Sequence, residues 1–288
     1  SKINWIKASI RYFKLISNSE YQKYFSHSGK TVFRVIAIEM LSKIKKIYRK
    51  HFIDKYTHRD VDSGEKFVYF PLGLEPERSI LIPAPFYSNQ LNVIKNVAKS
   101  LPVDYMLYVK EHPMQQIWGW RSVSYYEEIL KLQNVRLIHP SLPNGKLVDN
   151  CSLVVAVVGT PSLEAAFREK PSIVFGNVIF SSLTSVLRVQ NLEDLPKLIK
   201  TGLNTKVNLS DVNKFVNIIE KNSFEYDDFD FIVKICDKFF YSGYLYDVNI
   251  PVSEMELFLE ENKKIYNLLG SEHLKKINQI KNQKIKNS

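Results

Sequence analysis

The sequence predicts an α/β fold built on a Rossmann-like parallel sheet, with helices added at both ends. Short apolar runs alternate with helical patterns from residue 67 to residue 175. The apolar runs are continuous, which is typical of strands that are covered on both faces of a parallel sheet. The length of 288 residues, of which 45% are hydrophobic, suits one large domain or two small ones.

The first 60 residues are predicted to form a basic helical segment. Within it, apolar residues recur at spacings of three and four, namely Phe33, Ala37, Met40, Ile44 and Ile47. Such a stripe either packs on the rest of the protein or lies on a membrane surface, and packing is the interpretation that we favour. Residues 58–66 then follow as a linker.

Residues 61–205 are predicted to form the Rossmann-like domain. Strands are expected at residues 67–70, 79–82, 105–109, 135–138, 153–158 and 172–175. Helices are expected at residues 87–100, 123–132, 146–150 and 161–168. Ligands of such a sheet bind at the carboxyl ends of its strands, so functional residues are expected there.

The pattern from residue 192 onward is mostly helical. Helices are expected at residues 192–200, 209–221, 229–240 and 253–286. We assign residues 206–288 to C-terminal helices with a basic tail, and we expect the low-complexity end of this tail to fray.

The net charge of +10 belongs to the two ends of the chain. Residues 1–60 hold 14 Lys and Arg against 4 Asp and Glu, and residues 263–288 hold 7 Lys against 1 Glu. Such ends attract an anionic membrane surface or an anionic polymer, although solvated helical faces have the same composition. No RNA-binding signature with interleaved aromatic residues accompanies the charge, so no nucleic-acid partner is expected.

The two cysteines predict the redox compartment. Cys151 and Cys236 are far apart in the sequence and lie in segments that read as buried, which favours free thiols in a reducing cytoplasm. The apolar runs are too short to span a bilayer, and no signal peptide is visible. We therefore expect a cytoplasmic protein, which the basic ends would hold at the inner face of the cell membrane if they bind lipid.

Three strand ends carry polar residues. Glu75, Glu77 and Arg78 follow the first strand, "KEHP" follows the strand at 105–109, and "VVGTPSLEAAF" includes the end of the strand at 153–158. Because the carboxyl ends of parallel strands meet at one edge of the sheet, we expect these three segments to converge.

The third segment has the features of an anion site at a helix start. Gly159 allows a tight turn, Thr160 can cap the helix, and Pro161 suits the first helical position. Ser162 and the backbone N–H groups of the first turn are expected to point out of the helix end, where a phosphate would bind. Glu164 could cap the helix or accept hydrogen bonds from ribose hydroxyls. An ordinary capped helix is the alternative, and a P-loop is excluded because no Gly-Lys-Ser/Thr follows.

The second segment, Lys110–Pro113, places four functional groups at a strand end. His112, held by Pro113, can donate to a phosphate or a base carbonyl, and a structural role in a loop is the alternative. Lys110 could pair with Glu111 or neutralise a diphosphate. His139 precedes a proline at another strand end, where a loop role is favoured over a ligand contact.

Other kinds of chemistry find little support in the sequence. Neither cysteine lies in a CxxC pair and no HExxH occurs, so no metal site is expected. The sequence contains no GxSxG nucleophile elbow and no GxGxxG dinucleotide fingerprint. It identifies no catalytic base.

Residues 67–176 resemble a known family. The run "YFPLGLEPERS … DYMLYVKEHP … VRLIHP … VVAVVGTPSLEAAFREKPSIVFG" is similar to the capsule polysaccharide biosynthesis proteins of bacteria and archaea, which include Kdo-transferring glycosyltransferases. The resemblance implies a GT-B architecture, in which two Rossmann-like lobes face one another and the C-terminal lobe binds a nucleotide sugar. The N-terminal segment would then be a remnant or a replacement of the other lobe.

The resemblance also implies site residues. The His-Pro pair and the Gly-Thr helix start of the family contact the nucleotide and its phosphate, and here these are His112 with Pro113 and Gly159 with Thr160. Glu164 matches the acidic residue of the same helix. The chain departs from the family's Thr-Gly-Thr at Val158, which removes one hydroxyl and leaves the donor's identity open.

The expected function is therefore a glycosyltransferase, or its donor-binding lobe, in capsule or surface polysaccharide synthesis. CMP-Kdo is the donor that the resemblance implies, a glycan or glycolipid is the acceptor, and no further cofactor is expected. The alternatives are another sugar-nucleotide enzyme, such as an epimerase or a glycerophosphate polymerase, and a non-catalytic module that binds nucleotide sugars.

Overall fold

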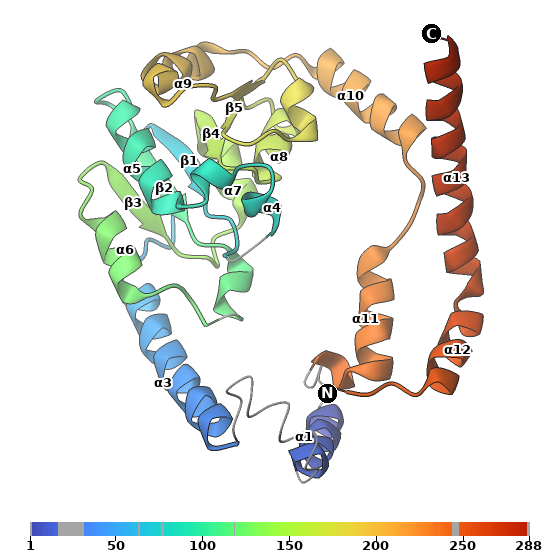
Figure 1. Cartoon of the computed structure of the whole chain (residues 1–288). Coiled ribbons are helices and arrows are strands. Elements are labelled where there is room, and N and C mark those ends of the chain that lie inside the picture. The colour runs from blue at the N-terminus through green and yellow to red at the C-terminus, as the bar shows by residue number, and fades with distance from the viewer. Residues whose placement is uncertain are drawn as a thin grey trace. The chain divides into compact units, whose positions relative to one another are not determined.

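The computed structural model describes residues 2–16, 32–62, 64–75, 78–117, 119–243 and 248–286 (Figure 1). The chain forms two compact units. One comprises residues 36–221, and the other comprises residues 1–35 together with residues 222–288. The domain boundaries expected at residues 60 and 205 remain predictions.

The unit of residues 36–221 is built on a sheet of six parallel strands, which confirms the predicted fold class. The strands are β1 (Phe67–Pro71), β2 (Met106–Lys110), β3 (Val135–Ile138), β4 (Leu153–Ala156), β5 (Ser172–Val174) and β6 (Val186–Arg188), in the order β3-β2-β1-β4-β5-β6. The direction of strand progression reverses between β1 and β4. This switch point opens a crevice at the carboxyl ends of the strands, where such sheets bind ligands.

Helices cover both faces of the sheet (Figure 1). The helices of this unit are α3 (Val32–Tyr56, which begins in the other unit), α4 (Arg78–Leu81), α5 (Gln90–Ser100), α6 (Val123–Leu130), α7 (Asn144–Asn150), α8 (Pro161–Phe167), α9 (Leu195–Asn204) and α10 (Leu209–Asn222). The short 3₁₀ helices are Pro85–Tyr87, Pro113–Gln116, Ile179–Ser182 and Leu192–Asp194. Side chains of α5, α6 and α9 pack on one face of the sheet, and those of α7 and α8 pack on the other.

Strand β1 shows why the sequence forms this layered core. Its side chains alternate between the faces, with Val68 and Phe70 on the α5 side and Phe67 and Tyr69 on the α7 side. All four are buried, so the strand has no polar face. A continuous apolar run is therefore the pattern that a strand in this position requires.

Helix α3 packs on the sheet unit only through its C-terminal turns. Ile53 is fully buried, and Arg49 donates hydrogen bonds from Nη1 to the carbonyl oxygens of Gly119 and Trp120 at 3.0 and 2.9 Å. The apolar stripe that we expected to pack on the protein is exposed instead, with Ile44 64% and Ile47 72% accessible.

Other sequence predictions differ from the structure in two segments of this unit. Residues 79–82, expected as a strand, lie mostly in helix α4, where Ile80 is buried while Leu81 and Ile82 are exposed. An apolar run this short does not distinguish a strand from a helix. Strand β6 was not predicted, because only three residues pair with β5 and Arg188 interrupts the apolar run.

The other unit is helical. It contains α1 (Lys2–Ile16), α11 (Asp228–Phe239), the short 3₁₀ helix Tyr241–Gly243, α12 (Val252–Glu261) and α13 (Lys263–Lys286), and its core is formed by Phe231, Phe239 and Phe258. The tail that we expected to fray continues α13 as far as Lys286. In neither unit does a described helix combine the length and hydropathy needed to cross a membrane.

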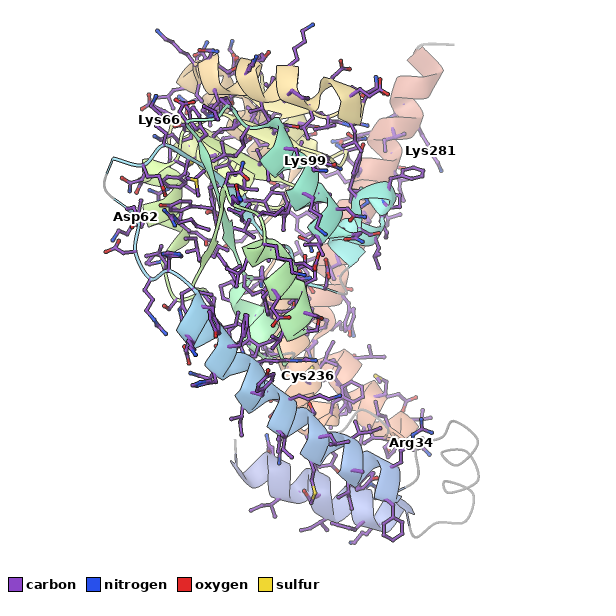
Figure 2. The ribbon with its side chains drawn as sticks, turned by 90° about the vertical axis from the view of Figure 1, so that its left-hand side faces the viewer. Arg34, Asp62, Lys66, Lys99, Cys236 and Lys281 are labelled. Atoms are coloured by element: carbon purple, nitrogen blue, oxygen red, sulfur yellow. The ribbon has the colours of Figure 1, made fainter. Side chains whose placement is uncertain are left out.

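Both cysteines are free thiols, as predicted. Cys151 is buried after α7, and burial raises the pKa of its thiol to about 12. Cys236 in α11 is half-buried. Figure 2 labels Cys236, along with Lys99 at the end of α5 and both Asp62 and Lys66 on the segment that leads into β1.

Candidate nucleotide-binding site

A cavity of about 270 Å³ lies at the switch point of the sheet. The segments that follow β1, β2 and β4 line it, together with residues of α4, α7 and α8. The predicted site residues that line it are Lys110, Glu111, His112, Pro113, Gly159 and Thr160. The ends of all three strands that the sequence singled out therefore meet in one cavity, although Glu75 does not line it.

Lys110 supplies a buried positive charge to this cavity. The residue is 3% exposed, and its Nζ donates a hydrogen bond to Asn144 Oδ1 at 2.5 Å. Burial lowers the pKa of the ammonium group to about 8, and the negative charge of Glu164 acts in the opposite direction. Within the described part of the chain no carboxylate lies within ion-pair distance of Lys110, so its charge is only partly compensated.

Asn144 and Tyr69 complete a polar group around Lys110 that the sequence did not reveal. Tyr69 donates from its hydroxyl to the same Asn144 Oδ1 at 3.1 Å, and both residues line the cavity. Asn144 is the first residue of α7, and Tyr69 points to that side of the sheet from β1. An oxygen that accepts from two donors fixes the position of the ammonium group.

His112 presents one ring nitrogen to its own loop. Its Nδ1 accepts a hydrogen bond from the Met114 backbone N–H at 3.1 Å and thereby caps the short helix Pro113–Gln116. In the neutral imidazole the proton is then on Nε2, which is left to donate. His112 is half-buried and lines the cavity, so this donor is available to a ligand.

The start of α8 differs from the expectation in part. Gly159 and Thr160 line the cavity, but the Thr160 side chain does not cap the helix. Ser162, which we expected to point out of the helix end, is fully buried, and its N–H is bonded to the Gly159 carbonyl at 3.1 Å. Glu164 is half-buried and does not line the cavity, but its charge influences the pKa values of both Lys110 and Tyr69.

Glu111 does not pair with Lys110, which corrects one of the two interpretations of Lys110. The carboxylate is 1% exposed and accepts hydrogen bonds from Arg121 Nε at 2.8 Å and from the Tyr126 hydroxyl at 2.7 Å. It also accepts from the His112 backbone N–H at 2.6 Å. These bonds hold the turn that presents His112, so Glu111 has a positioning role in this arrangement.

Arg121 extends this buried network to the loop that follows β1. Its guanidinium group donates to the Gly73 carbonyl at 2.5 Å and pairs with Glu75. Gln90 holds both backbone groups of Gly73, accepting from its N–H at 2.7 Å and donating to its carbonyl at 3.1 Å. The loop that forms one wall of the cavity is therefore fixed from behind by Arg121 and Gln90.

Two of the four weaker candidates, Glu75 and His139, lie outside the cavity. Glu75 belongs to the network around Arg121 and does not line the cavity. Glu77 lies outside the described residues, and Arg78 is the first residue of α4 with a side chain that the structure does not describe. His139 bonds to Asp54 of α3 through Nε2 at 3.1 Å and to Ser141 through Nδ1 at 2.6 Å, and burial lowers its pKa. These bonds give His139 a structural contact with α3.

The polar side chains of the cavity suit an anion. They include the Lys110 ammonium and the His112 imidazole, and the Glu111 carboxylate, which also lines the cavity, is engaged by Arg121 and Tyr126. Among the described residues, no cluster of three or more His, Cys, Asp or Glu side chains is placed to hold a metal ion.

The fold and the site together define an α/β protein with a doubly wound sheet and a candidate anion site at its switch point. The chain belongs to the capsule polysaccharide biosynthesis protein family, whose sequence model matches residues 6–193. This match confirms, at the level of the family, the resemblance that the sequence of residues 67–176 indicated. Among curated proteins, no match to the chain was found.

Several solved structures are similar to part of the chain. KpsC of Thermosulfurimonas dismutans, a β-Kdo 2,7 transferase, shares 15% identity over 62% of this chain and 56% of its own, with a TM-score of 0.38. UDP-GlcNAc 2-epimerase of Methanocaldococcus jannaschii shares 16% identity over 55% of this chain and 43% of its own, with a TM-score of 0.40. MnaA of S. aureus, solved with UDP, shares 16% identity over 54% of this chain and 40% of its own, with a TM-score of 0.37. This chain thus spans about half the length of these structures.

Proposed function

We propose that residues 36–221 form the donor-binding lobe of a glycosyltransferase that uses a nucleotide-activated sugar for capsule or surface polysaccharide. The observation that carries this proposal is the buried ammonium of Lys110. A buried charge is costly unless a partner compensates it, and here the only described partner is the neutral amide of Asn144. A phosphate in the cavity would supply the missing negative charge.

The geometry supports a phosphate position between the ends of β2 and β4. Lys110 and His112 line the cavity from the β2 side, and Gly159 and Thr160 line it from the start of α8. In sugar transfer the bond between the anomeric carbon and the phosphate oxygen breaks, and the negative charge that develops stays on the leaving phosphate. Lys110 and His112 would stabilise that charge electrostatically.

The donor in this proposal is a CMP-linked sugar such as CMP-Kdo, and the acceptor is a glycan or a glycolipid at the cytoplasmic side of the cell membrane. The family supports a role in capsule synthesis, and the Kdo donor rests on the resemblance alone. The acceptor hydroxyl would lose its proton to a base that the described residues do not identify.

A panel of nucleotides tests the donor site. CMP should raise the melting temperature of the chain, and UDP, GDP and CDP should raise it less. The shift should disappear in His112→Ala, because the variant lacks the Nε2 donor. His139→Ala is the matched control, since His139 lies outside the cavity, and it should keep the shift caused by CMP. Absence of a shift with every nucleotide would contradict the proposal.

Two other functions are distinguished by nucleotide sugars. Stabilisation by UDP-GlcNAc in preference to CMP, with interconversion of the sugar, would favour a 2-epimerase. Binding of a nucleotide sugar without transfer to any glycan acceptor would favour a non-catalytic module. The carboxylates nearest the cavity do not decide between these functions, because Glu111 is engaged by Arg121 and Glu164 does not line the cavity.

A further inference from the structure

Helix α3 carries an exposed apolar face on the side opposite to the one that packs. The residues of this α3 face in the sheet unit are Ile36, Ala37, Met40, Leu41, Ile44, Ile47 and Tyr48, and all of them are exposed. At about 100° per residue they fall within an arc of about 140°. Arg49 and Ile53, which pack on the sheet unit, project roughly from the opposite side of the helix.

The packed side fixes the orientation of the helix. Arg49 Nη1 bonds to two carbonyl oxygens of the loop that precedes α6, and Ile53 is buried in the core beside the sheet. Since these contacts hold the helix from one side, the α3 face points away from its own unit. Figure 2 shows α3 in blue, with side chains projecting along its length.

Cations flank the α3 face on both sides. Lys43 follows one edge of the apolar arc and Lys45 the other, and Lys46 lies towards the packed side. Lys43 and Lys45 are exposed and form no ion pair with any residue that the structure describes. An apolar arc bordered by lysines suits a bilayer, because the apolar side chains enter the acyl boundary while the ammonium groups stay at the level of the phosphates.

We infer that the α3 face binds the surface of an anionic lipid bilayer. A second copy of the chain is the less favourable occupant. Two such faces packed together about Ile44 in an antiparallel pair would bring Lys43 and Lys45 of both copies close to one another, and like charges would oppose the association. An anionic lipid surface removes that repulsion and attracts the same lysines.

Co-sedimentation of the whole chain with vesicles tests this inference. The chain should be recovered with vesicles of phosphatidylcholine and phosphatidylglycerol, and much less with phosphatidylcholine alone. Each lysine near an anionic surface strengthens binding about five-fold, so Lys43→Gln with Lys45→Gln should weaken it about 25-fold. Ile44→Ser with Ile47→Ser should weaken it about a hundred-fold or more, because buried apolar area is lost.

A matched control separates this face from general basicity. Lys197 and Lys200 on α9 are exposed and adjoin no such apolar arc, so Lys197→Gln with Lys200→Gln makes the same charge change and should leave binding unaltered. All six substituted side chains are exposed, so thermal unfolding should not change. Equal recovery with neutral and anionic vesicles would overturn the inference. A dimer in light scattering that dissociates in Ile44→Ser with Ile47→Ser would also overturn it and assign the face to a second copy.

Discussion

Lys110→Met is expected to bind the nucleotide about 30-fold more weakly than the unmodified chain at pH 7. The substitution removes the buried cation while it keeps most of the volume of the side chain. A hydrogen bond to a charged group contributes about 2 kcal/mol, which corresponds to this factor. Isothermal titration calorimetry measures the affinity directly. An affinity within two-fold of the unmodified chain would show that the ammonium group does not contact the ligand.

The ammonium group of Lys110 also makes the affinity for the nucleotide depend on pH. Burial lowers the pKa of Lys110 to about 8, so in the free protein the side chain is mostly protonated below pH 8 and mostly neutral above it. Affinity should change by no more than about two-fold between pH 7 and pH 8 and should then fall with rising pH towards the loss of about 30-fold expected from removing the charge. Lys110→Arg is the control, because a guanidinium group stays charged throughout this range and its affinity should not fall.

The stability of the unliganded chain should change with pH in the opposite direction. The pKa of Lys110 is lower in the folded protein than the ordinary value of 10.5 for a lysine side chain. Between about pH 8 and pH 10.5 the unfolded chain therefore binds more protons at this residue, and its contribution makes the folded state more stable as the pH rises. Lys110→Met should remove this contribution to the pH dependence, which urea unfolding at pH 7.5 and pH 9.5 would measure.

The second large effect is expected from Arg121→Leu, which should lower the free energy of unfolding by about 3–5 kcal/mol. Breaking one side of a buried ion pair leaves the other charge uncompensated. Here Glu111, which is 1% exposed, would lose its Arg121 partner, and the Gly73 carbonyl would lose its guanidinium donor. Urea unfolding followed by tryptophan fluorescence measures the change, since Trp118 and Trp120 adjoin the substitution in sequence.

A double variant and an exposed pair control this prediction. Arg121→Leu with Glu111→Gln should cost less than the sum of the two single substitutions, because no buried carboxylate then lacks its partner. The Arg168–Asp149 pair is the matched control, as its side chains are 44% and 53% exposed. Arg168→Leu should cost no more than about 1 kcal/mol. Similar losses for Arg121→Leu and Arg168→Leu would rule out a stabilising role for the buried network.

Much of the sheet could be predicted because its strands are buried on both faces. The runs at β1 and β4, and that of β2 as far as Val109, are apolar, and the Lys110–Pro113 segment marks the end of β2 by an abrupt change to polar residues. Parallel strands place such ends at one edge, so the convergence of His112 with Gly159 followed from the order of the elements alone.

The partners of the site residues could not be predicted, because they depend on tertiary contacts between distant segments. Asn144 is 34 residues from Lys110, and nothing in the local sequence marks it as a hydrogen-bond acceptor for a buried lysine. Glu111 was placed beside Lys110 by sequence, but side chains of neighbouring residues in a strand point to opposite faces. Glu111 therefore accepts from Arg121 and Tyr126, whereas Lys110 and Tyr69 both donate to Asn144 on the other face.

The central claim is that Lys110 binds the phosphate of a nucleotide, and a comparison of CMP with cytidine tests it most directly. Calorimetry at pH 7 should show that CMP binds the unmodified chain at least ten-fold more tightly than cytidine does. In Lys110→Met this difference should shrink to about two-fold or less, while the affinity for cytidine stays the same. If CMP and cytidine bind the unmodified chain equally, or if Lys110→Met preserves their difference, Lys110 is not the phosphate contact.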